Sequence, residues 1–202
     1  MSRLGMRHHT CVPRSLRSRN ETPWFKTHCV YRLVWIGLNE PSICIEKARP
    51  EDSQEILRVI NETNREAFGR IIPKEHFKEP ILTREELCEC LEKMTFYLLR
   101  HEEQTVAVAA LSVEDEDSGR IRWVYVLPAY QNRGFGTALV RHLEKVGEEL
   151  GLKKMKLVTD DGAKWAIRFY HRLGYTLAHS VPNPWGFDVW MEKQLPLQPD
   201  TK

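Results

Sequence analysis

The order of hydrophobic and polar residues becomes regular only at residue 42. Segment 42–48 alternates isoleucine with polar residues, which predicts a short strand. Pro50 then opens a helix whose apolar residues lie three and four apart, and Gly69 ends it. A second helix follows Thr83, because Thr83 and Glu86 form a capping box ahead of leucines that share one helix face.

The remaining pattern changes from hairpins to strand–helix–strand units. Three antiparallel strands are predicted at 95–101, 105–113 and 120–127, with a charged turn at 114–119. They are followed by a helix from about residue 136 to Gly151 and a strand at 154–159. The next helix is capped by Asp160 or Asp161 and ends at Gly174. Strands at 175–180 and 187–194, on either side of the loop 181–186, complete the predicted elements. This order favours a mixed α/β fold.

Charge is distributed unevenly along the chain. The 202 residues include 30 Lys and Arg against 28 Asp and Glu, but the first 40 hold seven basic and only two acidic side chains. We therefore expect a basic, poorly ordered extension at 1–41, a folded domain at 42–195 and a tail at 196–202. The extension is interpreted as a loose segment or an over-called start, with organelle targeting as the alternative. The small net charge predicts neither a nucleic-acid nor a membrane partner.

Cysteines and apolar runs bear on the compartment and on metals. None of the five cysteines has zinc-ligand spacing, which favours reduced thiols and a cytoplasmic location. The longest apolar run, at 30–38, is far shorter than the ~20 residues of a membrane span. The acidic turn 114–119 lacks the glycine and glutamate of a calcium loop, so no metal is expected.

The strongest chemical signal is a strand followed by QNRGFG and a helix. Gly134 and Gly136 allow a tight turn and a close approach of a ligand, and the first N–H groups of the helix favour an anion. A phosphate or pyrophosphate is the natural guest, with Arg133 as an added charge. An ordinary strand-to-helix loop is the alternative reading. Thr137 and Ala138 stand where a P-loop needs Lys and then Ser or Thr, which excludes that motif.

A dinucleotide-binding protein remains a further alternative. Asp160 lies 24 residues after Gly136, about where such folds place the acid that binds the ribose. Position 139, however, is Leu where the fingerprint has its third glycine, and the preceding strands form hairpins rather than parallel crossovers. Both features weaken this interpretation.

Two motifs resemble a known family. The run VLPAYQNRGFGTALVRHLEKVGEELG resembles motif A of the GNAT superfamily of acetyltransferases, and AIRFYHRLGY resembles its later A-x-x-F-Y-x-x-x-G-F/Y segment. The order of elements agrees over residues 43–194. The resemblance implies a central mixed sheet of about seven strands, flanked by about four helices, with one splayed parallel strand pair.

The resemblance also implies a site for acetyl-CoA as co-substrate between strands 121–127 and 154–159. The pantetheine arm pairs with backbone near Val126, and the pyrophosphate lies on the N–H groups that follow. The residues expected at the cofactor are Val124, Tyr125, Val126, Gln131, Asn132, Arg133, Gly134, Phe135, Gly136, Thr137 and Asp160. The 3′-phosphate needs a cation, for which Arg168, His171 and Arg172 are equal candidates.

The implied reaction is attack of a neutral amine on a thioester. Tyr170 occupies the family's position for the general acid, and a tyrosine of ordinary pKa ~10 is protonated at neutral pH. The N–H near Val126 is the expected oxyanion donor. Arg120 stands where many relatives have a glutamate base, and Ala163 where many have an asparagine. The base therefore stays open among Asp160, His179, Asp188 and a water relay.

The acceptor is expected between the loops 68–77 and 181–187, where Trp185 offers either an aromatic wall or core cover. The predicted function is N-acetylation of a primary amine, carried by a small molecule or a peptide. A homodimer is left open. The alternatives are a non-catalytic acyl-CoA-binding module, suggested by Arg120 and Ala163, and the dinucleotide-binding protein described above.

Overall fold

The computed structural model describes residues 43–196, so the predicted extension at 1–41 lies outside the described residues. The elements in chain order are β1 (Ile43–Lys47), a 3₁₀ turn (Pro50–Asp52), α1 (Ser53–Phe68), α2 (Arg84–Lys93), β2 (Thr95–His101), β3 (Gln104–Val113), β4 (Ser118–Val126), a 3₁₀ turn (Pro128–Tyr130), α3 (Phe135–Glu149), β5 (Lys154–Asp160), α4 (Lys164–Arg172), β6 (Thr176–Asn183) and β7 (Gly186–Gln194).

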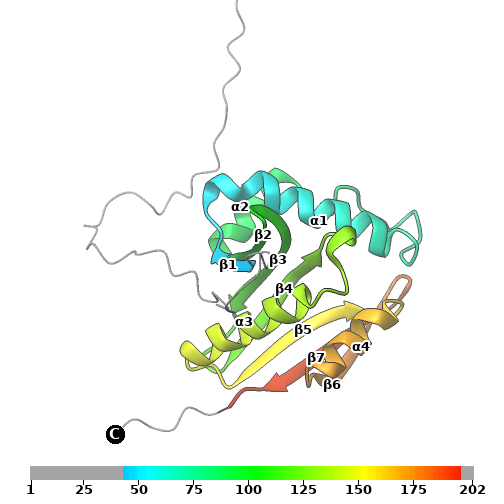
Figure 1. The fold of residues 1–202 in the computed structure, drawn as a ribbon. Helices are drawn as coiled ribbons and strands as arrows, with labels where there is room; N and C mark the ends of the chain where they lie inside the picture. Colours follow the sequence, from blue (N-terminus) through cyan, green and yellow to red (C-terminus); the bar gives the residue numbers. More distant parts are fainter. Residues whose placement is uncertain (1–42, 197–202) are drawn as a thin grey trace, which may run out of the picture.

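The seven strands of the described residues form one sheet in the order β1-β2-β3-β4-β5-β7-β6 (Figure 1). Every neighbouring pair is antiparallel except β4 and β5, which are parallel. The predicted mixed α/β fold with one parallel pair is therefore confirmed.

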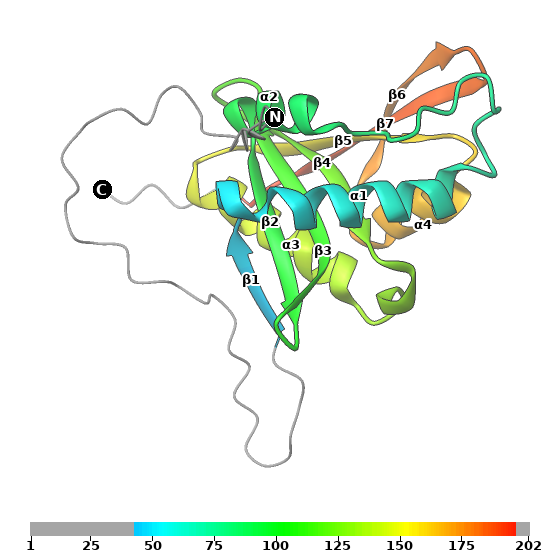
Figure 2. The same cartoon turned by 90° about the horizontal axis from the view of Figure 1, so that it is seen from above.

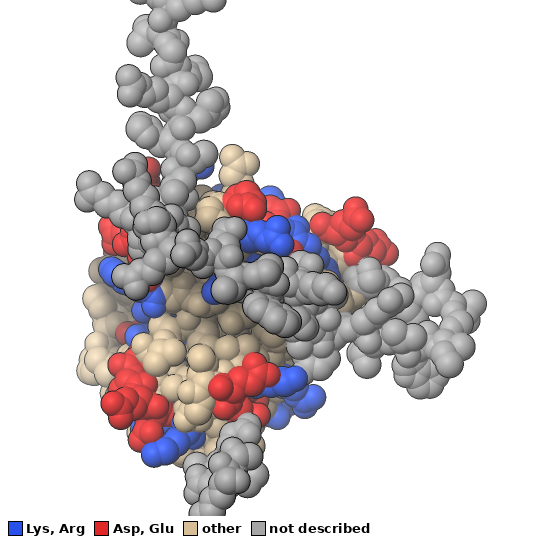
Figure 3. Space-filling model, turned by 90° about the vertical axis from the view of Figure 1, so that its left-hand side faces the viewer, with Lys and Arg blue, Asp and Glu red and all other residues tan. Residues whose placement is uncertain are grey.

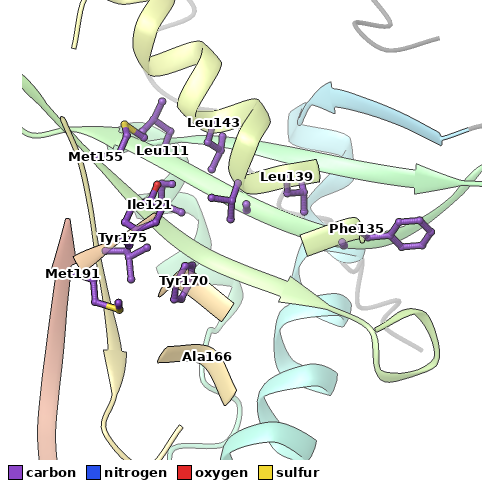
Figure 4. Close-up of a cluster of buried hydrophobic side chains, with 14 of the residues drawn as sticks. Leu111, Ile121, Phe135, Leu139, Leu143, Met155, Ala166, Tyr170, Tyr175 and Met191 are labelled. Atoms are coloured by element: carbon purple, nitrogen blue, oxygen red, sulfur yellow. The ribbon is translucent and has the colours of Figure 1, made fainter. Parts of the chain in front are cut away.

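Helices cover both faces of the sheet, and each face has its own core. On one face, Ile56 and Ile60 of α1 pack with Leu87 of α2 and with Phe96 of β2. On the other, leucines of α3 pack with Met155 of β5 and with residues from α4 (Figure 4). Figure 2 shows α1 and α3 on opposite faces of the sheet. This layering leaves the C-terminal end of β4 between the two cores.

Several local predictions are confirmed. The Thr83 hydroxyl accepts from the Glu86 N–H at 3.2 Å, and the Glu86 carboxylate accepts from the Thr83 N–H at 2.9 Å, as a capping box requires. Gly151 ends α3 with a φ of 77° in the left-handed region that glycine adopts without strain. The first helix differs at its start, because Pro50 opens a 3₁₀ turn and α1 begins at Ser53.

Two predictions in the last third of the chain are wrong. The segment 181–186 is not a loop: β6 continues to Asn183 and β7 begins at Gly186. Pro182 is tolerated inside β6 because this strand is at the edge of the sheet, where one side needs no ladder hydrogen bond. Asp160 and Asp161 do not cap α4, whose N-cap is Ala163. Both carboxylates have other partners, described below.

Surface charge, helix hydrophobicity and the cysteines also bear on the predictions. Figure 3, which views the left-hand side of Figure 1, shows acidic side chains interspersed with basic ones among the described residues of that face. None of the helices in residues 43–196 is long and apolar enough to cross a membrane. Cys90 is a free thiol, but Cys88 is disulfide-bonded, so the expectation of reduced cysteines is wrong for Cys88.

Candidate active site

The site begins where two parallel strands separate. β4 pairs with β5 only over Ser118–Arg120, although β4 stays paired with β3 as far as Val126. β5 meanwhile remains paired with β7 up to Asp160. The C-terminal halves of β4 and β5 therefore diverge (Figure 1). The backbone of β4 that faces β5 has no strand partner there and is available to a ligand.

A bulge in β4 marks the same place. Val108 of β3 lies opposite Tyr125 and Ala110 opposite Arg122, so two residues of β4 stand against one of β3. Trp123 has a φ of 54°, which is uncommon for a bulky side chain and costs on the order of 1–3 kcal/mol. The bulge interrupts the regular alternation of side chains along β4, so that Trp123 packs on the side of α1 and Val124 on the side of α3.

A cavity of about 810 Å³ occupies this space. Its walls come from α1, β4, the loop before α3, the start of α3, the end of β5, α4, and the turn between β6 and β7. The cavity therefore reaches both faces of the sheet. We call the part beside α3 and α4 the cofactor half and the part beside α1 and the β6–β7 turn the acceptor half.

The cofactor half is built from backbone. Gly134 has a φ of 83° and is the N-cap of α3, and the first intrahelical bond is donated by the Ala138 N–H to the Gly134 carbonyl at 2.9 Å. The N–H groups of Phe135, Gly136 and Thr137 therefore have no intrahelical acceptor. With the partial positive charge of the helix N-terminus, they fit a phosphate or pyrophosphate.

Gly136 is needed for close approach rather than for an unusual φ. A Cβ on Gly136 would lie 3.4 Å from the Phe169 ring and 3.6 Å from the Val126 side chain. Anything larger than a methyl group at this position would have to displace these neighbours or extend into the cavity. The glycine thus keeps α3, α4 and β4 close together around the cofactor half.

The cavity brings together all but one of the residues predicted for the site. Arg133 is the exception: its guanidinium lies over the Tyr130 ring at 5.3 Å, and it is not part of the cavity wall. Among the three candidate cations for a terminal phosphate, Arg168 and Arg172 line the cavity and His171 does not. The predicted residues that line it are Val124, Tyr125, Val126, Gln131, Asn132, Gly134, Phe135, Gly136, Thr137, Asp160 and Tyr170.

Tyr170 projects from α4 into the core between helix and sheet, where it also reaches the cavity (Figure 4). Its ring packs edge-on against Phe169 and Tyr175. Burial, with a smaller contribution from Tyr125, raises the pKa of the Tyr170 hydroxyl above its ordinary value. Within residues 43–196 this hydroxyl has no hydrogen-bond partner. Tyr170 can therefore offer a proton to a group bound in the cavity.

Two of the candidate bases have other contacts. Both oxygens of Asp160 accept hydrogen bonds, from the Gly162 N–H at 2.8 Å and from the Trp185 indole N–H at 2.6 Å. His179 stacks on Trp190 with ring centroids 5.5 Å apart and lies outside the cavity wall. Asp160 therefore holds Trp185 in place, and His179 does not reach the cavity.

Asp188 differs from these two. It lines the cavity beside Asp160, to which it is paired across β5 and β7. One of its oxygens accepts from the Asn183 amide at 2.9 Å. The other oxygen has no hydrogen-bond partner among residues 43–196, and it is available to accept a proton.

The acceptor half is built from side chains that are far apart in the sequence. Trp185 of the β6–β7 turn lies 5.3 Å from the His76 ring in the loop after α1. Phe68 at the end of α1 packs against Trp165 at 5.9 Å and Tyr125 at 6.5 Å. These contacts join the two loops that were predicted to contact the acceptor.

Several residues of the acceptor half were not predicted from the sequence, among them Thr63, Asn64 and Arg122. The Tyr125 hydroxyl donates to the Asn64 side chain at 3.1 Å, which ties β4 to α1. Thr63, next to Asn64, and Arg122 also line the cavity. No sequence motif distinguishes Thr63 and Asn64 from the other polar residues of α1. The grouping of Arg122 with Trp123 on one side of β4 depends on the bulge at Trp123.

Known proteins match both the sequence and the fold. Residues 56–175 match the model of the acetyltransferase (GNAT) family. The chain is 28% identical to YxbD of Bacillus subtilis over 113 residues (56% of this chain, 69% of the relative) and 27% identical to an amino-acid acetyltransferase of Mycobacterium tuberculosis over 138 residues (66% and 75%).

Among solved structures, the chain resembles the PaiA N-acetyltransferase of Thermoplasma acidophilum, crystallised in complex with coenzyme A. The TM-score is 0.68 at 19% identity, covering 76% of this chain and 99% of that one. At this identity the similarity establishes the fold.

Proposed function

Since the chain belongs to the GNAT family of acetyltransferases, we propose that it transfers the acetyl group of acetyl-CoA to a primary amine. The observation that carries the proposal is the divergence of β4 and β5 beside the free N–H groups of α3. This arrangement gives one ligand both an unpaired strand edge and an anion site.

The residues of the cofactor half fit acetyl-CoA. The N–H groups of Gly136 and its neighbours suit the pyrophosphate, and Arg168 and Arg172 supply cations for a further phosphate. The unpaired edge of β4 suits the amide-bearing pantetheine arm. The structure of the Thermoplasma acidophilum protein in complex with coenzyme A supports the same choice of ligand.

The transfer needs one bond formed, one broken and two proton movements. The amine nitrogen bonds to the thioester carbon, and the carbon–sulfur bond then breaks with its electron pair on sulfur. Tyr170 donates its proton to the departing thiolate and is reprotonated from solvent. A backbone N–H near Val126 stabilises the negative charge that develops on the carbonyl oxygen.

The proton that the amine loses has one well-suited acceptor in the cavity. Asp188 has a carboxylate oxygen without a hydrogen-bond partner in the described residues, whereas both oxygens of Asp160 are engaged. We assign Asp188, acting through water, as the group that removes this proton. Arg120, which stands where many relatives have a glutamate, stacks on Trp190 at 4.3 Å, and its guanidinium has no acceptor for the proton.

Acetyl-CoA-dependent release of free thiol in the presence of a panel of amines tests the proposal. We expect release that depends on the amine, together with acetylated product in one-to-one ratio. Binding of acetyl-CoA without amine-dependent release would identify a non-catalytic acyl-CoA-binding module. Thermal stabilisation by NAD but not by acetyl-CoA would identify a dinucleotide-binding protein instead.

A further inference from the structure

The acceptor half contains an arginine without an anionic partner. Arg122 is partly buried and lines the cavity. Within residues 43–196 it forms neither an ion pair nor a hydrogen bond. By contrast, Arg120, two residues earlier on β4, contacts Glu114 and stacks on Trp190. A partly buried guanidinium with five unused N–H donors favours an oxyanion as its guest.

Arg122 faces α1 and α2 rather than the cofactor half. Burial raises the pKa of the Cys90 thiol on α2, and Arg122 lies close enough for its charge to oppose part of that rise. Trp123 packs into the core on the same side. The next residue, Val124, packs on the opposite side, against α3 and α4. The bulge therefore presents two successive side chains, Arg122 and Trp123, to the acceptor half.

Other hydrogen-bond donors of this wall also lack partners. The Trp123 indole N–H and the Thr63 hydroxyl are shielded from solvent and bonded to no described residue. Thr63 is only 3% exposed. The Asn64 side chain accepts from Tyr125 through its oxygen, which leaves its amide N–H groups free to donate. Together with Arg122, these side chains offer several donors without acceptors, and a buried donor without an acceptor is costly, by about 1–3 kcal/mol.

We propose that the acceptor is an amine that also carries a carboxylate, which Arg122 binds with the assistance of Thr63 and Trp123. This inference rests on the proposed acetyl transfer and names its substrate class. The carboxylate lies toward α1 and α2, and the amine lies toward the diverging ends of β4 and β5. Free amino acids and peptides with an acidic residue share this chemistry.

Matched acceptors test the proposal. One pair is leucine and leucinamide, and the other is a short peptide with glutamate or glutamine at its second position. Because the carboxamide lowers the pKa of the neighbouring amine, kcat/KM is expressed per neutral amine. For the wild-type protein we expect the carboxylate form to be favoured by roughly tenfold or more in at least one pair, about the effect of one charge-assisted hydrogen bond.

Variants separate a charge contact from a structural role. In Arg122→Gln the preference for carboxylate should fall to about one, while Arg122→Lys should keep part of it. Arg120→Gln is the matched control, because Arg120 is two residues away on β4 but outside the cavity wall, and its preference should equal that of the wild type. A wild-type ratio near one in both pairs, or an equal loss in the Arg120 variant, would overturn the proposal.

A binding measurement distinguishes failure of this inference from failure of the proposed function. Calorimetric titration of the same four acceptors into the protein with coenzyme A requires no turnover. Tighter binding of a carboxylate form that disappears in Arg122→Gln supports the carboxylate site even if no amine is acetylated. Turnover of amines with no carboxylate preference in rate or binding would leave acetyl transfer standing and refute the carboxylate site.

Discussion

The two halves of the cavity are built in different ways. The cofactor half uses mainly backbone groups of one continuous segment, from the end of β4 to the first turn of α3, with side chains added from α4. The acceptor half uses side chains from α1, the loop after it, β4 and the β6–β7 turn. Backbone N–H groups tolerate changes of side chain, whereas a wall of side chains can change its specificity residue by residue. Proteins with different side chains can therefore bind the same cofactor in the first half, while the side chains of the second half determine which acceptor is bound.

The largest expected effect lies where the two halves meet, at Tyr170. Tyr170→Phe removes the proton donor for the thiolate and should lower kcat about 100-fold, with acetyl-CoA affinity and melting temperature nearly unchanged. Tyr175→Phe is a matched control, because its hydroxyl is also buried, beside Glu144, but lies outside the cavity wall. Steady-state kinetics measures both. Equal losses in the two variants would contradict a catalytic role for Tyr170.

The same tyrosine makes a prediction about pH. Because burial raises the pKa of Tyr170, the hydroxyl should remain protonated beyond pH ~10, the ordinary value. The rate should therefore rise as the amine loses its proton and then stay level up to about pH 10. A decline of kcat that begins near pH 8 and is absent in Tyr170→Phe would show that the hydroxyl titrates earlier than its burial implies.

A somewhat smaller effect is expected from the cofactor half alone. Gly136→Val places methyl groups against Phe169 and Val126 and should weaken acetyl-CoA binding by about tenfold or more. Gly136→Ala adds a Cβ at ordinary contact distance and should change the affinity by less than about threefold. Calorimetry gives both dissociation constants. If Gly136→Ala weakened acetyl-CoA binding as much as Gly136→Val, the close packing of Gly136 against Phe169 and Val126 would not be the reason for glycine at this position.

The acceptor half should respond independently. Trp185→Phe keeps an aromatic ring near His76 but loses the hydrogen bond to Asp160, so KM for the amine should rise a few fold while acetyl-CoA affinity is unchanged. Trp190→Phe, outside the cavity wall, should change neither. If the Trp185 variant weakened acetyl-CoA and amine equally, the two halves would not be separable.

The smallest expected effect is on the pH dependence of stability, and it comes from His142, a residue outside the cavity wall. Burial lowers the pKa of His142 on α3, whose ring lies 4.9 Å from Tyr97. The unfolded chain therefore binds a proton near pH 6.5 that the folded state resists, so stability falls as the pH drops below that value. His142→Leu should flatten the dependence of melting temperature on pH between 7.5 and 5.5. An unchanged slope in this variant would contradict the assignment to His142.

The sequence is most informative where a requirement is local. Gly134 needs a left-handed backbone, and Gly136 lies at a helix start, so both could be identified from the letters around them. The capping box at Thr83 is local in the same sense. The mixed sheet follows from the order of strands and helices together with the family resemblance.

What could not be predicted depends on contacts between distant segments. Asp160 and Asp161 stand between a strand pattern and a helix pattern, a position typical of caps. Asp160 instead accepts from the Trp185 indole in the β6–β7 turn, and Asp161 from the Phe187 N–H at the start of β7. Arg122 and Trp123 face the same side only because of the bulge, which interrupts the alternation of a regular strand. Sequence patterns of period two cannot show such a bulge in advance.

Hydrogen exchange with and without acetyl-CoA tests the division of the cavity most directly. We predict slower exchange for peptides that cover Val124–Thr137, including the first turn of α3, and little change in the loop 69–82 and the β6–β7 turn. NAD should have no such effect. Protection confined to the loop and the turn, or equal protection by NAD, would contradict the account of acetyl-CoA bound between β4 and β5.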